Sequence, residues 1–310
     1  METAAIIDCG TNTFHLLIVQ LSTPVVKLHE EKQVVKIGEG GINDGKIAPM
    51  AADRALKALI HFKRKIDEYH INEVRAVATS AFRNAINGIE LAQEIHKQTG
   101  IALNIISGQD EASLIYRGIS KAVTVRADTT LSMDIGGGSV EFIIAREELV
   151  LWSESFEIGA QRLMDLFHKH DPILKHEVEQ LQLYLIDALN SLFTACNKLK
   201  PTTLIGSSGT FDTLSKIYCR TKDIKIEEDQ SETPLTLSAF YRIHKQLIEY
   251  NRAQRLALPG MIEMRVDMIV VASCIIEVLL KKIPIEDIRV SKYALKEGIL
   301  AEIVDGHGLS

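Results

Sequence analysis

The chain has 310 residues, of which 46% are hydrophobic and 25% charged, and its formal net charge is −6. This composition is ordinary for a globular protein, and the length is sufficient for two domains with hydrophobic cores. The negative charge gives no bulk attraction to nucleic acid or to an anionic membrane, so we expect neither DNA nor a membrane as a partner. Four cysteines without metal-type or redox spacing indicate reduced thiols in the cytoplasm.

The first half begins with a strand–loop–strand unit. Apolar strands are predicted at Ala4–Ile7 and Phe14–Leu21, and a short polar loop separates them. The loop contains Asp8, Gly10, Thr11, Asn12 and Thr13. The pattern then predicts a strand region at 25–37, a helix at 49–69, a strand at 73–79, a helix at 89–99, a strand at 102–106 and a helix at 109–121.

A second copy of this unit opens the other half, at Leu131–Ile144, about one domain length further along. Asp134 aligns with Asp8, Gly136 with Gly10, and Ser139 with Thr13. A single Gly-Gly-Gly segment could serve only a hairpin turn, but the repetition predicts two like-folded domains that face each other across a cleft.

The loop composition is typical of phosphate binding. Glycines such as Gly137 and Gly138 lack a Cβ, so a phosphate can approach the backbone N–H groups. Asp134 stands at the mouth of the turn, where a carboxylate can hold Mg²⁺ against a phosphate. The predicted strand at 203–205 leads into Ser208, Gly209 and Thr210, which are either a third phosphate contact or an ordinary helix cap.

The remainder of the second half is predicted to be mostly helical. We expect a strand at 150–156, helices from 160 and at 176–199, a helix at 237–250, a buried helix around 268–280, a strand at 288–290 and a closing helix at 293–304. Local positive charge could come from Lys32, Lys36, Arg117 and Arg265, although a single Lys or Arg is more often a solvated or structural charge. His15 is expected to pack in or beside the sheet.

Taken together, these motifs resemble those of the exopolyphosphatase and guanosine pentaphosphate phosphohydrolase family. That family lies within the superfamily of acetate and sugar kinases, heat-shock ATPases and actin. The matching segments are Asp8–Phe14, Thr79–Ala85, Ile106–Gly118, Met133–Glu141, Ile205–Thr210, Leu258–Arg265 and Val290–Leu300. The resemblance implies an α/β protein with two ribonuclease H-like domains and the active site between them. We place these domains at residues 1–124 and 125–310, and the C-terminal helix at 293–310 could complete the first.

The resemblance also implies roles for single residues. Glu111 takes the position of the catalytic base, and Arg83 that of the arginine that grips substrate. The phosphate loops correspond to Gly10, Thr11, Asn12, Thr13, Gly136, Gly137, Gly138 and Ser139, and the metal ligands to Asp134, Glu141 and Asp8. The implied cofactor is Mg²⁺, with Mn²⁺ as an alternative. Without the resemblance, Glu111 would suit the first turn of a helix, Arg83 could be a surface residue and Glu141 could face solvent.

The implied activity is hydrolysis of a terminal phosphoanhydride, from inorganic polyphosphate or from the 5′ end of guanosine pentaphosphate. Some members of the family carry further helical domains, so we expect this chain to prefer shorter polymers or nucleotides. A kinase or ATPase of the same superfamily and a non-catalytic polyphosphate or nucleotide sensor are the other classes considered. A homodimer is one assembly that the sequence leaves open.

Overall fold

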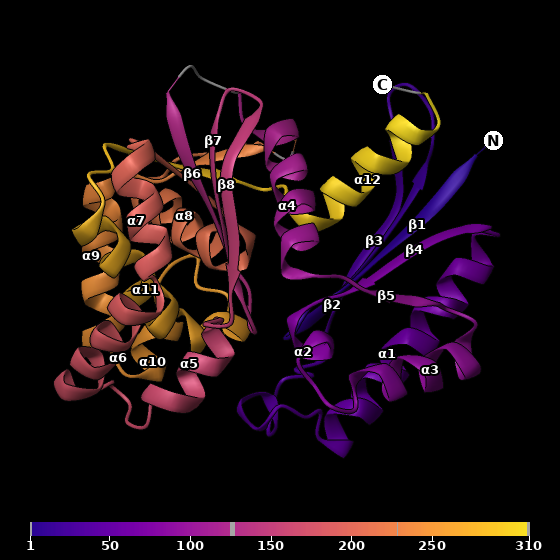
Figure 1. Ribbon diagram of the computed structural model, residues 1–310, viewed down its shortest axis with the longest axis horizontal. Coiled ribbons are helices and arrows are strands. Elements are labelled where there is room, and N and C mark those ends of the chain that lie inside the picture. The colour runs from indigo at the N-terminus through magenta and orange to yellow at the C-terminus, as the bar shows by residue number, and fades with distance from the viewer. Residues whose placement is uncertain (1, 125–127, 228, 309–310) are drawn as a thin grey trace.

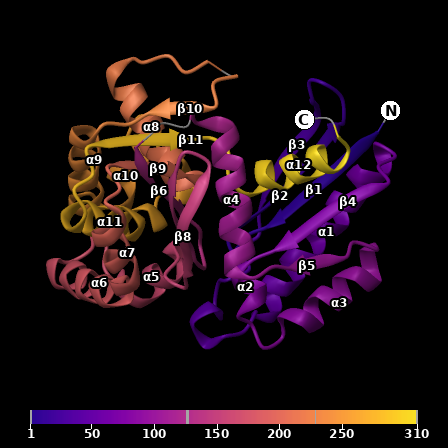
Figure 2. The ribbon, with the colours of Figure 1, turned by 45° about the horizontal axis from the view of Figure 1, so that its top comes forward.

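The computed structural model describes residues 2–124, 128–227 and 229–308. Within them the chain forms two β-sheets with helices packed around them, which confirms the predicted α/β class. Figures 1 and 2 show the two sheets side by side, with the first half of the chain around one and most of the second half around the other.

The first sheet has five strands in the order β3-β2-β1-β4-β5. β1 pairs antiparallel with β2 and β2 with β3, whereas β4 and β5 run parallel to β1. Nearly all residues of β1 and β2 are buried because helices cover both faces of the sheet. The strands are β1 (Thr3–Cys9), β2 (Thr13–Gln20), β3 (Val26–Val34), β4 (Glu73–Ala78) and β5 (Leu103–Ile105).

The second sheet repeats this arrangement. Its order is β10-β11-β9-β6-β7-β8, so β8-β7-β6-β9-β11 corresponds to the whole first sheet. β6, β7 and β8 are antiparallel, and β9 and β11 run parallel to β6. The predicted duplication therefore extends from the loop motif to the sheet. The strands are β6 (Thr129–Ile135), β7 (Val140–Arg146), β8 (Leu149–Phe156), β9 (Thr203–Ser207), β10 (Glu232–Pro234) and β11 (Asp287–Ser291).

Three hydrophobic cores support the two sheets. One joins the first sheet to α1 (Pro49–Glu68) and α3 (Gly88–Thr99). Another joins the second sheet to helices that include α5 (Ala160–Phe167), α8 (Ser208–Lys222), α9 (Leu237–Glu249) and α11 (Met268–Lys282). The third lies between the sheets and is built on α4 (Gly108–Ala122) and α12 (Leu295–Gly306), which pack against each other (Figure 1).

The third core explains why α12 matters to the first half. Ile299 and Ile303 of α12 share this core with Ile6 of β1 and Ile115 of α4. The last helix therefore packs on the sheet formed by the first residues of the chain. The boundary proposed between residues 124 and 125 borders on residues 125–127, which lie outside the described part of the chain, and it stays a prediction.

The structure differs from the sequence-based elements in a few places. The single helix predicted at 176–199 is wrong, because α6 (Lys175–Ala188) and α7 (Asn190–Leu199) are separated at Leu189, whose ψ of 18° leaves the helical range. The side chain of Leu189 is buried in the core of the second half, so the bend between the two helices packs against that core. The elements α2 (Ser80–Arg83), α10 (Arg252–Leu256) and β10 were not predicted, because their three to five residues are too short to show periodicity.

Two short 3-10 helices complete the fold, η1 (Ile42–Asp44) and η2 (Glu263–Arg265). Among the described residues, no helix combines the length and the apolar character that crossing a bilayer requires.

Candidate active site

The two polar loops adopt the same turn. The N–H of Gly10 donates to the carbonyl of Thr13 at 3.2 Å, and the N–H of Gly136 donates to the carbonyl of Ser139 at 3.0 Å. The aligned residues of the two motifs therefore make the same backbone hydrogen bond at the turn. In both copies the aspartate before the turn is the second-to-last residue of its strand and lines the cavity described below.

The two loops lie against each other. A Cβ added to Gly137 would collide with the side-chain amide of Asn12, and a Cβ added to Gly138 would collide with the hydroxyls of Thr11 and Ser80. Glycine is thus required here because the facing loop fills the space that a side chain would occupy. The strand–loop units of the two halves meet in one site, as a shared cleft requires.

A cavity of about 160 Å³ lies between the loops. Most of the residues that the sequence nominated line it, which are Glu111, Asp8, Gly10, Thr11, Asn12, Thr13, Asp134, Gly136, Gly137, Gly138, Ser139, Glu141, Ser208 and Gly209. Arg83 and Thr210 do not line it. Thr210 is buried in the first turn of α8, and the phosphate contacts expected for these two residues stay predictions.

Asp134 is held by hydroxyl groups. Ser207 donates to its Oδ2 at 2.7 Å, and Ser208 donates to its Oδ1 at 2.7 Å. Ser208 has a φ of 66°, a backbone conformation that a residue with a side chain rarely adopts. Burial raises the pKa of Asp134, although both hydroxyls oppose that shift. The carboxylate is therefore oriented but carries a charge that the protein alone compensates incompletely.

Glu141 lies opposite Asp134 on the next strand. Its side chain is 1% exposed and accepts a hydrogen bond from Ser155 at 2.7 Å, so the alternative that it faces solvent is wrong. Burial raises the pKa of Glu141 well above its usual range, and the nearby carboxylates of Glu111 and Asp134 add to the shift.

Glu111 enters the site from the first turn of α4. Ser107 caps this helix by accepting the N–H of Asp110 at 3.1 Å, which fixes where the turn begins. One carboxylate oxygen of Glu111, Oε2, accepts a hydrogen bond from Nη1 of Arg83 at 2.9 Å. Burial raises the pKa of Glu111 to about 7, whereas the charge and the hydrogen bond of Arg83 oppose that rise.

Cations also line the cavity. The guanidinium of Arg265 lies directly over Gly209, and Lys32 faces the same cavity from β3. Within the described residues neither side chain makes a hydrogen bond or an ion pair, whereas Lys296 pairs with Glu30 at 3.3 Å. Burial lowers the pKa of Lys32 to about 8, and the charge of Arg265 adds to the shift.

The sequence identified Lys32 and Arg265 only as sources of local charge, and it did not nominate Lys296 or Asp212, which also line the cavity. Their positions depend on how α12 and η2 pack against the loops, which no local pattern records. The signals in the sequence were the family-matching segments Leu258–Arg265 and Val290–Leu300, which contain Arg265 and Lys296. The cations at Lys36 and Arg117 lie elsewhere, since neither lines the cavity and Arg117 pairs with Asp305 of α12.

Asn12 presents an unusual polar atom. Its side chain is 6% exposed, and its Nδ2 donates to the sulfur of Met268 at 3.0 Å. Its Oδ1 is buried and has no hydrogen-bond partner among the described residues. A buried acceptor without a donor is costly, so a ligand or ion beside it would be stabilised.

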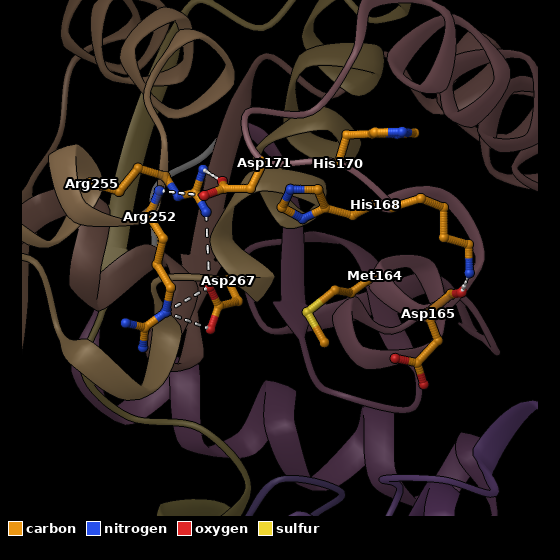
Figure 3. A pocket seen from close by; sticks show the side chains of 9 residues that line it. Met164, Asp165, His168, His170, Asp171, Arg252, Arg255 and Asp267 are labelled. Carbon is orange, nitrogen blue, oxygen red and sulfur yellow. Dashed lines mark hydrogen bonds and ion pairs between the residues drawn. The ribbon is translucent and has the colours of Figure 1, made fainter.

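Two other hollows differ from this cavity. A groove of about 1660 Å³ opens next to it and shares His15, Lys32, Asp212 and Lys296 with it. A separate hollow of about 480 Å³ lies in the second half beside the ends of α5 and α10 (Figure 3). There the buried Arg255 pairs with Asp171 at 2.8 Å and Arg252 pairs with Asp267 at 3.2 Å, so the charges compensate one another.

Comparison with known proteins shows the family of this chain. The model of the Ppx/GppA phosphatase family matches residues 18–307. This chain belongs to the Ppx/GppA phosphatase family. The resemblance inferred from the motifs is thereby confirmed.

Related proteins match along nearly the whole chain. Exopolyphosphatase 2 of Mycobacterium tuberculosis is 28% identical over 319 residues, which cover 95% of this chain and 96% of that protein. The crystal structure of an exopolyphosphatase from Cytophaga hutchinsonii is 45% identical, with a TM-score of 0.95 and 98% of each chain covered. The crystal structure of the Aquifex aeolicus family member is 23% identical, with a TM-score of 0.82, 100% of this chain and 99% of that chain covered, and it shows the shared fold.

Proposed function

We propose that this protein is an exopolyphosphatase, which hydrolyses the terminal phosphoanhydride of inorganic polyphosphate and releases orthophosphate. The observation that supports it most is the buried carboxylate of Glu111 at a small cavity walled by two glycine-containing loops. Membership of a phosphatase family and the 45% identity to an exopolyphosphatase agree with this proposal.

Glu111 is the proposed general base. Arg83 engages Oε2, and Oε1 makes no hydrogen bond among the described residues, so it is available to accept a proton from the attacking water. Because burial raises its pKa to about 7, Glu111 binds a proton readily near neutral pH. Its ionised form is the base, so we expect hydrolysis to increase as the pH rises through about 7.

The loops and the unpaired cations are the proposed phosphate ligands. The N–H groups around Gly137 and Gly138 lie in a turn that suits an anion, and the corresponding turn at Gly10 faces them. Arg265 and Lys32 carry charge that no carboxylate of the described residues neutralises within ion-pair distance. Together these groups would neutralise the developing charge and align the terminal phosphate, which are the main requirements of phosphoryl transfer.

The residues present also suit Mg²⁺. No three His, Cys, Asp or Glu residues of the described chain lie close enough to hold a metal by themselves. Mg²⁺, however, is bound mostly by one or two carboxylates, water and substrate phosphates. Asp134, Glu141 and Asp8 supply carboxylates whose pKa values burial raises, and the unpartnered Oδ1 of Asn12 lies nearby. Bound there, Mg²⁺ would neutralise charge on the phosphate oxygens.

One observation favours a second substrate, guanosine pentaphosphate. The groove beside the cavity has apolar walls, which include Leu17, Tyr293 and Leu300, as well as lysines. A polymer of phosphates gains nothing from apolar walls, whereas a nucleoside would bury its base against them.

The deciding experiment measures phosphate release from short polyphosphate, long polyphosphate, guanosine pentaphosphate and ATP, with wild type and Glu111→Gln. We expect the fastest turnover on polyphosphate, and a loss of roughly 10²- to 10⁴-fold in Glu111→Gln, the usual worth of a general base. Preferred turnover of the guanosine nucleotide would select the second substrate. ATP turnover with phosphate transfer would indicate the kinase class, and tight binding without release would indicate a sensor.

A further inference from the structure

Glu157 lies in the connection between β8 and α5 of the second half, and it contacts the first half of the chain. Its Oε1 pairs with Nη2 of Arg83 at 3.1 Å, and its Oε2 accepts a hydrogen bond from Ser80 at 2.6 Å. Both partners belong to α2, which follows β4 of the first sheet. One carboxylate thus holds two residues of the opposite half.

The guanidinium of Arg83 is fully oriented by its surroundings. Nη1 donates to the carbonyl of Ile106 at 3.1 Å and to Glu111 at 2.9 Å, and Nη2 donates to Glu157 at 3.1 Å. Because the guanidinium is planar, acceptors on both of its ends determine where Nη1 points. Glu157 therefore influences how Glu111 is presented without reaching the cavity itself, whose lining does not include it.

A second arginine ties Glu157 to the glycine loop. Nη2 of Arg162 pairs with Oε2 of Glu157 at 3.1 Å. Nε of Arg162 donates to the carbonyl of Gly138 at 2.8 Å, and Nη1 donates to the carbonyl of Ile42 in the first half at 2.7 Å. The first turn of α5 adds to this support, since the N–H of Ala160 donates to the carbonyl of Gly136 at 2.9 Å. The carboxylate of Glu157 thus contacts both Arg83, which binds Glu111, and Arg162, which binds the glycine loop.

We propose that Glu157 is a positioning residue, which holds Arg83, and through it Glu111, in register with the glycine loop of the opposite half. The inference rests on the proposed function of Glu111 as the base. The contacts of Glu157 span the two halves, so they form only when the halves are together. Glu111 is consequently aligned when the halves are in contact, and it loses one of its supports when they separate.

The test combines steady-state kinetics on polyphosphate with a double-mutant cycle of Glu157→Ala and Arg83→Ala. We expect Glu157→Ala to lower kcat roughly 10-fold, the scale of a misaligned catalytic group, with KM within about twofold of wild type. The loss should be non-additive, so that the double variant is no slower than Arg83→Ala alone within about twofold. Equal losses in kcat and binding, or additive losses, would overturn the proposal.

Glu154→Ala provides the matched control. Glu154 lies three residues before Glu157, on β8, and its side chain makes no hydrogen bond or ion pair among the described residues. We expect its kcat to stay within about twofold of wild type. A loss equal to that of Glu157→Ala would show that removing any carboxylate from this part of the chain has the same effect, and would reject a specific role for Glu157.

The same cycle measured by thermal unfolding separates this inference from the proposed function. If wild type released no phosphate from any substrate, the proposed function would be rejected. The Tm values would still decide whether Glu157 holds Arg83, because contacting residues give non-additive changes. Additive shifts in Tm would reject the contact itself.

Discussion

The two loops of this protein share one backbone turn and differ in what their side chains do. At corresponding positions the first loop has Thr11 and Asn12, and the second has Gly137 and Gly138. The side chains of the first loop fill the space in front of the glycines of the second. The two loops can therefore pack against each other because the second loop has glycines where the first has side chains.

The strands behind the loops also differ in charge. Asp8 lies opposite His15, whose pKa burial lowers to about 3, so that the imidazole is neutral near pH 7. Asp134 lies opposite Glu141, a second buried carboxylate. The carboxylate of Asp134 is supported by two hydroxyls, whereas that of Asp8 has no hydrogen bond among the described residues. The second half is thus better arranged to hold a cation, and the first half to complete the cavity around it.

The most severe way to break this complementarity is to add a side chain to the second loop. We expect Gly137→Ala to lower kcat/KM on polyphosphate at least about 100-fold, because its methyl group collides with Asn12 and displaces one loop from the other. In Gly10→Ala the added Cβ would lie 3.1 Å from the carbonyl oxygen of Thr13, a contact that small shifts relieve.

The matched measurement is kcat/KM for both variants beside wild type. A Gly137→Ala loss no larger than that of Gly10→Ala would refute the complementarity of the loops. The double variant Asn12→Ala with Gly137→Ala sharpens the test, because removing the facing amide should restore part of the loss.

Glutamine substitutions at the two cross-strand positions should have an intermediate effect. We expect Glu141→Gln to weaken the apparent Mg²⁺ affinity roughly 10-fold, since it removes a buried carboxylate beside Asp134. His15→Gln occupies the corresponding position in the first half and should leave the Mg²⁺ affinity within about twofold. Titration of phosphate release with Mg²⁺ measures both. Equal weakening in the two variants would contradict the assignment of the cation to the second half.

The smallest expected effect concerns the hydroxyl support of Asp134. Ser207 faces Asp134 across the β6–β9 pair, whereas the corresponding pair in the first half joins Asp8 to the apolar Val77. We expect Ser207→Ala to lower the free energy of unfolding by about 1 kcal/mol, the usual worth of a hydrogen bond, as measured by denaturant titration.

Ser132→Ala is the control for that measurement. Ser132 is also buried on β6, but its hydroxyl has no hydrogen-bond partner among the described residues. Removing it should cost no stability, because an unsatisfied buried hydroxyl does not stabilise the fold. If both variants lost the same stability, the cause would be packing and not the hydrogen bond to Asp134.

Much of the fold was predictable because its signals are local. Consecutive residues show the two loops that begin at Asp8 and Asp134, the apolar strands around them and the long amphipathic α1. The repetition of the loop predicted the repeated sheet. The short elements α2, α10 and β10 were missed because their conformation follows from packing. The break at Leu189 was missed because both flanking segments have good helical patterns.

In the candidate site, too, the features within local motifs were predictable and the features set by packing were not. Asp134, Glu111 and the glycines stand in motifs, so the sequence by itself predicted which residues line the candidate site and that the two halves share one sheet arrangement. Only the tertiary structure decided that Arg83 turns to Glu111 and Glu157, that Arg265 and Lys32 line the cavity without an ion pair to any described residue, and that Asn12 meets Gly137. The physical reason is that these contacts join residues far apart in the chain, and a side chain's partner depends on which surfaces pack together, which a local pattern does not record.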